Sequence, residues 1–178
     1  MSPTSSSTLP DETPSLGLRR AGYTITAALL ALVVGIAAAD AIGSVAILGV
    51  DSRTVSANGG GVDLEVTYGA VSRPALATPF DIEVHQAGGF DGPVRVAVDR
   101  EYFRMWDENG LVPAPSAETV MGAWLVWEFD PPLGDTLRVT YDARIEPAAQ
   151  EGRSGAVAVL DAEDAVLTQV AFTTRLWP

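Results

Sequence analysis

His85 is the only histidine in the sequence, and it is the side chain best suited to acid–base chemistry near neutral pH. A single imidazole excludes a metal site built from several histidines, and any Ser-His-Asp arrangement would have to include this residue. His85 is followed by Gln86, Ala87 and two glycines, and the sequence contains no Gly-x-Ser-x-Gly elbow. We therefore expect His85 to be a surface residue and the protein to have no enzymatic activity.

Two acidic clusters carry oxygen ligands of the kind that calcium prefers. One is residues 107–109 (Asp-Glu-Asn), and the other is Asp161 with Glu163 and Asp164. Neither has the spacing of an EF-hand loop, and Asp and Asn favour turns for backbone reasons. The sequence also contains no cysteine, which excludes thiolate ligands and disulfides. We expect turns at both clusters and no metal or other cofactor.

Aromatic side chains form the candidate binding patch of this sequence, because exposed rings often mark interaction surfaces. Large rings also dominate the interiors of β-sandwiches, and this core role is the favoured interpretation. If residues 123–129 form a regular strand, its two tryptophans point to opposite faces. The candidate residues are Tyr102, Phe103, Trp106, Trp124 and Trp127.

Strands must position these side chains, because apolar and polar residues alternate from Val62 onward. Turn-forming runs separate the alternating segments, for example residues 88–93, 131–134 and 161–164. Short alternating segments at this spacing predict a mainly β domain, an antiparallel sandwich or barrel. The segments are 62–68, 80–84, 94–98, 137–145 and 165–175.

Two segments depart from the alternating pattern. Residues 100–108 (REYFRMWDE) are compatible with a helix that caps one end of the sandwich. Residues 51–61 end in three glycines and are expected to be a juxtamembrane linker, although residues 54–56 could instead pair as an edge strand. The folded domain is therefore expected to span residues 62–178.

The order of these elements resembles the immunoglobulin-like modules of bacterial surface proteins, including the cell-adhesion-related type. The resemblance covers residues 62–175 and rests on the alternating strands, their Gly-rich and Pro-Pro-Leu-Gly turns, and the Trp-rich segment 123–129. It implies an antiparallel immunoglobulin-like sandwich used for display, spacing or binding. The cysteine pair of antibody domains is absent, and the resemblance assigns no functional residue.

Residues 21–50 contain a single charged residue, Asp40. A bilayer core about 30 Å thick needs roughly 20 apolar residues in a helix, so this segment predicts one transmembrane helix. Arg19 and Arg20 flank it on the N-terminal side, and positive residues near a span tend to stay in the cytoplasm. We expect a protein of the cytoplasmic membrane with its N-terminus inside and its β domain outside. Residues 1–20, rich in Ser, Thr and Pro, are expected to be a disordered cytoplasmic tail.

A cleaved secretory signal is the competing interpretation of the same segment. Arg19 and Arg20 would be its basic region, residues 23–34 its apolar core, and residues 37–39 or 39–41 its cleavage site. Cleavage there would leave a mature chain that begins with the apolar residues 41–50. The membrane anchor is favoured for that reason.

Small residues recur every four positions in the expected span, at Gly35, Ala39 and Gly43, which places them on one helix face. Such a face lets a second helix approach closely, and Asp40 beside it could meet a polar partner in another membrane protein or a second copy. The favoured interpretation is plainer. Alanine-rich spans produce this spacing by chance, and Asp40 would lie at the level of the outer headgroups.

Residues 51–178 contain twenty acidic residues and nine arginines, a net charge of −11. Because such a surface repels nucleic acid, we expect no nucleic-acid partner. The expected function is a non-catalytic interaction or accessory subunit of a membrane or envelope assembly, with the lipid bilayer as its first partner. The alternative is an exported module that binds carbohydrate or an ion.

Overall fold

The computed structural model describes residues 50–177, and the fold of this part is mainly β, with 63% strand and 3% helix. The predicted fold class is confirmed at this level. No helix in the described range is long and apolar enough to cross a membrane. A single helical turn, α2 (Arg100–Phe103), lies between the fourth and fifth strands. The strands are β1 (Asp51–Gly59), β2 (Val62–Ser72), β3 (Phe80–Gln86), β4 (Val94–Asp99), β5 (Trp106–Val112), β6 (Ala117–Met121), β7 (Trp124–Phe129), β8 (Thr136–Ile145), β9 (Arg153–Leu160) and β10 (Val166–Leu176).

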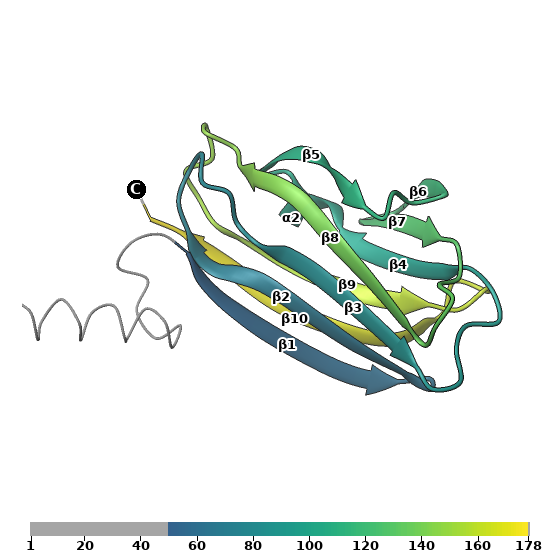
Figure 1. The fold of residues 1–178 in the computed structure, drawn as a ribbon. Coiled ribbons are helices and arrows are strands. Elements are labelled where there is room, and N and C mark those ends of the chain that lie inside the picture. Colours follow the sequence, from purple (N-terminus) through teal and green to yellow (C-terminus); the bar gives the residue numbers. More distant parts are fainter. Residues whose placement is uncertain (1–49, 178) are drawn as a thin grey trace, which may run out of the picture. The chain divides into compact units, whose positions relative to one another are not determined.

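The strands form two layers that pack face to face (Figure 1). One layer has the order β1-β2-β3-β8-β5, and the other has the order β10-β9-β4-β7-β6. Neighbours within each layer are antiparallel, as the sequence predicts. The layers join where Arg175 and Leu176 of β10 pair in parallel with the end of β2. The arrangement is compatible with a β-sandwich.

Alternation along the strands places one face of each layer in a shared core. In β8 the buried residues alternate with exposed or half-buried ones along the whole strand. Aromatic rings from both layers meet inside. Phe80 of β3 lies 5.6 Å from Phe172 of β10, and Trp127 of β7 lies 6.1 Å from Tyr141 of β8, measured between ring centroids.

Residues 51–59 are not a linker but strand β1, which pairs with β2 along its length. Its sequence is mostly polar because one face points to solvent, where the Thr54 and Thr67 hydroxyls hydrogen-bond at 2.8 Å. On the other face only Val55 and Ala57 pack against the core. The strand includes residues 54–56, the segment for which an edge strand is the alternative prediction. Two small apolar residues give too weak an alternation to predict its full length.

The helix expected over residues 100–108 is much shorter than predicted. It begins after Asp99, whose side chain accepts a hydrogen bond from the N–H of Glu101 at 2.9 Å, and it ends at Phe103. From Trp106 onward the backbone pairs with β8 instead. Tertiary pairing therefore overrides a local helix propensity that is only modest.

The chain gives the domain two distinct ends. Val50 leads into β1 at one end, where β2 and β10 also finish and the N–H of Trp177 donates to the Ser72 carbonyl at 2.9 Å. We call this the Val50 end. The turns between β1 and β2, β3 and β4, β7 and β8, and β9 and β10 lie at the opposite end, which we call the distal end (Figure 1).

Candidate functional site

Four of the five aromatic residues of the candidate patch lie in the core. Tyr102, Trp106 and Trp127 are only 0%, 7% and 2% exposed, and Phe103 is half-buried against them. Phe103 packs edge-on against Tyr141 at 4.9 Å between centroids. These four residues therefore do not form a binding patch, because their rings pack against one another in the core. This is the role that the sequence favoured for them.

Trp124 lies on the opposite face of β7 from Trp127, as the period of a strand predicts. It is half-buried over a small apolar cluster on the outer face of its layer, formed by Ala97, Val126, Ala158 and Leu160. A single, partly covered ring does not make the five-residue patch that the sequence suggested.

Four of the five acidic side chains of the two clusters have partners within the protein, namely Asp107, Glu108, Asp161 and Asp164. Asp161 Oδ1 accepts hydrogen bonds from the N–H groups of Glu163 and Ala165 at 2.9 and 2.8 Å, as a turn requires. Asp107 pairs with Arg144, and Glu108 accepts a hydrogen bond from the Tyr141 hydroxyl at 3.3 Å. Within residues 50–177, no three His, Cys, Asp or Glu side chains are grouped to hold a metal ion.

His85 lies at the distal end of β3, and its side chain is 39% exposed. Its Nδ1 is 3.2 Å from Thr136 Oγ1, and that hydroxyl donates a hydrogen bond to Asp135 Oδ1 at 2.9 Å. An activated nucleophile would instead donate its proton to the imidazole. The hydrogen-bond direction is thus opposite to that of a Ser-His-Asp relay.

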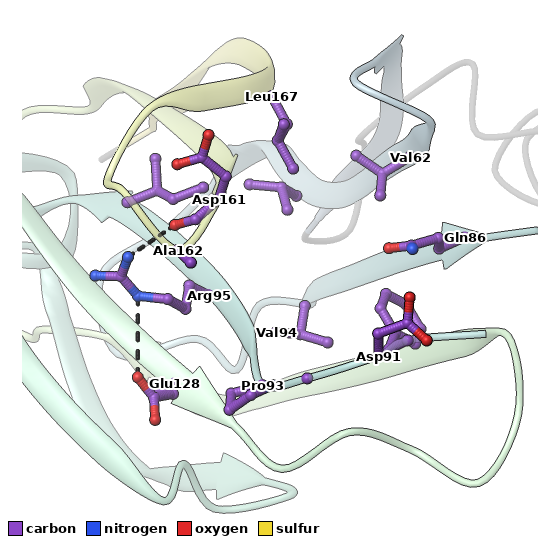
Figure 2. A pocket seen from close by; sticks show the side chains of 14 residues that line it. Val62, Gln86, Asp91, Pro93, Val94, Arg95, Glu128, Asp161, Ala162 and Leu167 are labelled. Carbon is purple, nitrogen blue, oxygen red and sulfur yellow. Dashed lines mark hydrogen bonds and ion pairs between the residues drawn. The ribbon is translucent and has the colours of Figure 1, made fainter.

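A pocket of about 520 Å³ opens at the distal end of the domain. Residues from both layers line it, since Val62 begins β2 and Gln86 ends β3, while Val94 begins β4 and Leu160 ends β9. Its floor is apolar, and its rim carries charged side chains (Figure 2). The larger apolar residues that line the pocket are Val62, Phe90, Pro93, Val94, Val159, Leu160 and Leu167.

Arg95 is the one basic side chain among the residues lining the pocket, and the protein itself occupies its guanidinium. Nη1 donates to the Asp161 carbonyl at 2.8 Å, and Nε lies 3.9 Å from Glu128 Oε2 (Figure 2). Nη2 pairs with Asp164 in the β9–β10 turn. Arg95 therefore fixes the β9–β10 turn to β4 and is not free to bind an anion. With Asp91 also on the rim, the pocket favours a ligand that combines an apolar body with a positive charge.

Exposed apolar side chains continue this surface beyond the pocket. Leu133 in the β7–β8 turn is fully exposed, and Val166, which pairs with pocket residue Leu160, is 52% exposed. The β7–β8 turn adjoins the β3–β4 turn, where Gln86 N–H donates to the Asp135 carbonyl at 2.9 Å. Exposed apolar residues next to a pocket with a polar rim are typical of an interaction site.

Arg95→Met tests whether Arg95 holds the pocket in shape. We expect a loss of about 1–2 kcal/mol in the free energy of unfolding, because the side chain is only 21% exposed and loses its hydrogen bonds to the Asp161 carbonyl and the Asp164 carboxylate. Hydrogen exchange should accelerate at the amides of Glu163 and Ala165. Arg138→Met is the matched control, since the pair between Arg138 and Glu83 is largely solvent-exposed, and it should leave those amides unchanged.

The helix-packing candidates Gly35, Ala39, Asp40 and Gly43, the expected span and the expected tail lie outside the described residues. Sequence reasoning did not find the pocket, because its walls come from turns far apart in the chain. The turn-forming runs of the sequence could have indicated it. Several of them follow strands that run in the same direction, so these turns gather at the distal end of the domain.

No protein-family model matches the chain, and no match is found among curated proteins. The function must therefore be argued from the residues and their geometry.

Proposed function

We propose that this protein is a non-catalytic interaction subunit, anchored in the cytoplasmic membrane by residues 21–50, which presents an immunoglobulin-like domain outside the cell membrane with its distal pocket as the binding site. The observation that carries this proposal is the pocket of about 520 Å³ at the end opposite Val50. A domain tethered at Val50 leaves its distal end accessible to a partner. The two antiparallel layers support the immunoglobulin-like assignment.

A binding role is favoured over catalysis by the state of the polar groups around the pocket. The Arg95 guanidinium and the Asp161 carboxylate are engaged in holding the turns. His85, the residue best suited to be a base, has a neighbouring hydroxyl that donates to a carboxylate instead. Such a site can select the shape and charge of a partner, but it lacks an activated nucleophile.

Ala162→Trp tests the pocket directly. Ala162 is an exposed residue of the rim, so a tryptophan there can fold over the opening without disturbing the core. With a photo-crosslinking amino acid at Gln86, we expect one defined covalent adduct in intact cells. Ala162→Trp should lower its yield roughly tenfold, the effect of about 1.4 kcal/mol on a binding constant.

Ala148→Trp is the control for this experiment, because Ala148 is an exposed alanine in the β8–β9 loop at the Val50 end. It adds the same side chain away from the pocket and should leave the adduct yield unchanged. An adduct that persists with Ala162→Trp would show that the pocket is not the binding site.

A further inference from the structure

The arginines of the domain are concentrated at the Val50 end. Seven of the nine lie within three residues of a strand terminus at that end or in the α2 turn beside it. Only Arg95 and Arg138 lie toward the distal end. The seven are Arg53, Arg73, Arg100, Arg104, Arg144, Arg153 and Arg175.

The acidic residues are divided between the two ends, so the seven arginines reduce the negative charge of the Val50 end without reversing it. The acidic residues at the Val50 end are Asp51, Asp81, Asp99, Glu101, Asp107, Glu108, Asp142, Glu146 and Glu151. Eight others occupy the distal turns or the strand ends that adjoin these turns: Asp63, Asp91, Glu128, Asp130, Asp135, Asp161, Glu163 and Asp164. Most of the net charge of −11 is therefore carried by the distal part of the domain, where only two of the nine arginines lie. The Val50 end is therefore much closer to neutral than the distal end.

Several of these arginines are bound within the domain. Arg104 and Arg153 both pair with Glu101, and Arg53 pairs with the buried Asp51. Arg144 pairs with Asp107. In contrast, Arg73 and Arg175 have no carboxylate within ion-pair distance in residues 50–177, and both are exposed.

Arg73 and Arg175 flank an exposed tryptophan. Arg73 follows Ser72, the residue whose carbonyl accepts the N–H of Trp177, and Arg175 pairs in parallel with Val71. Trp177 is 55% exposed, whereas the other three tryptophans of the chain are packed in the domain. Tryptophan and arginine together are the side chains that favour the boundary between lipid and water.

We infer that the Val50 end rests on the lipid surface, with Trp177 at the level of the headgroups and Arg73 and Arg175 on anionic headgroups. The occupant is a membrane because the chain enters β1 through Val50 at this end, and the apolar segment 21–50 directly precedes β1 in the sequence. The inference rests on the proposed membrane anchor. It adds that the β domain is oriented by the bilayer, with the acidic distal end facing away from it.

The test uses the full-length protein in vesicles of phosphatidylcholine with about one third phosphatidylglycerol, an anionic composition that attracts basic side chains. Phosphatidylcholine with a nitroxide on its headgroup quenches tryptophans at the surface. The difference between the wild type and Trp177→Phe isolates the signal of Trp177. We expect the headgroup probe to quench it and aqueous iodide to quench it little.

Arg73→Gln with Arg175→Gln should lower the nitroxide quenching of Trp177 by about twofold or more, as expected when two headgroup contacts are lost. Arg138→Gln removes an exposed arginine of β8 that lies toward the distal end, and it should leave the quenching of Trp177 unchanged. Equal nitroxide quenching of Trp177 in the wild type, the double variant and Arg138→Gln would show that Arg73 and Arg175 do not hold this end on the lipid surface. Full iodide quenching of Trp177 with no nitroxide quenching would overturn the inference as a whole.

Flotation of the same vesicles separates this failure from a failure of the anchor. If Trp177 is exposed to water while the protein floats with the vesicles after an alkaline wash, the anchor stands and only the orientation is wrong. If the protein does not float, the proposed membrane anchor itself fails.

Discussion

Phe80→Ala should bring the domain close to unfolding under otherwise native conditions. Phe80 is 1% exposed, and truncation of a buried Phe costs about 3–5 kcal/mol through lost transfer free energy and the cavity left behind. Lost aromatic pairs add to this cost by about 0.5–1.5 kcal/mol each when measured singly. We expect a loss of about 5 kcal/mol, against a total stability of about 5–15 kcal/mol for a domain. The rings around Phe80, at 5.1–6.2 Å between centroids, are Tyr102, Phe103, Trp106, Tyr141 and Phe172.

Phe129→Ala separates the ring cluster from simple burial. Phe129 is also 1% exposed, but in the described part of the chain it lies outside the cluster of aromatic pairs around Phe80. Urea unfolding followed by circular dichroism should show Phe80→Ala to be less stable than Phe129→Ala by about 1 kcal/mol or more. Equal losses would mean that the ring contacts add nothing beyond the buried area.

The fold could be predicted from the sequence where one face of a strand is buried and the other is solvated. β2, β3, β8 and β10 largely satisfy this condition, and the alternation of residues identifies each of them. The alternating valines also identify β4, although Ala97 on its outer face is buried as well. No such alternation marks β9, because its residues 157–160 are all buried. One face of β9 packs in the main core, and the other carries Ala158 and Leu160 beneath Trp124. A strand buried on both faces loses its alternation.

Less of the candidate site could be predicted than of the fold. The aromatic residues are ambiguous in the sequence, because large rings serve both cores and interfaces and a single sequence cannot distinguish these two roles. The pocket depends on Arg95, which reaches 66 positions along the chain to the Asp161 carbonyl. Composition was also misleading at the Val50 end, because a net charge carries no information about where the arginines gather.

Alkaline pH should unfold this domain through two buried tyrosines. The chain has four tyrosines but no lysine and no cysteine, so tyrosine is the side chain that titrates between about pH 9 and 12. Burial raises the pKa of Tyr102 well above its ordinary value, although the hydrogen bond with Thr174 opposes part of this effect. Burial also raises the pKa of Tyr141, and the negative charge of Glu108 raises it further.

The sign of the effect follows from the protons that each state binds. Above about pH 10 the unfolded chain releases the proton of each tyrosine, while the folded domain retains both. The free energy of unfolding therefore falls as the pH rises, by about 1.4 kcal/mol per pH unit for each tyrosine and about 2.7 kcal/mol per unit for both. Below about pH 9 these residues should give no pH dependence.

Tyr102→Phe and Tyr141→Phe should each halve this alkaline slope, and the double variant should remove most of it. Tyr102→Phe should cost about 1 kcal/mol at pH 7, because it loses the 2.8 Å hydrogen bond to Thr174. Thr174 still donates to the Gly69 carbonyl at 2.6 Å, so no buried hydroxyl is left without a partner. The variant is thus less stable than the wild type at pH 7 but more stable near pH 12, and the two stability curves cross. Urea unfolding at a series of pH values, read by far-ultraviolet circular dichroism, measures the slopes. A double variant that keeps the slope of the wild type would show that other groups cause the alkaline unfolding.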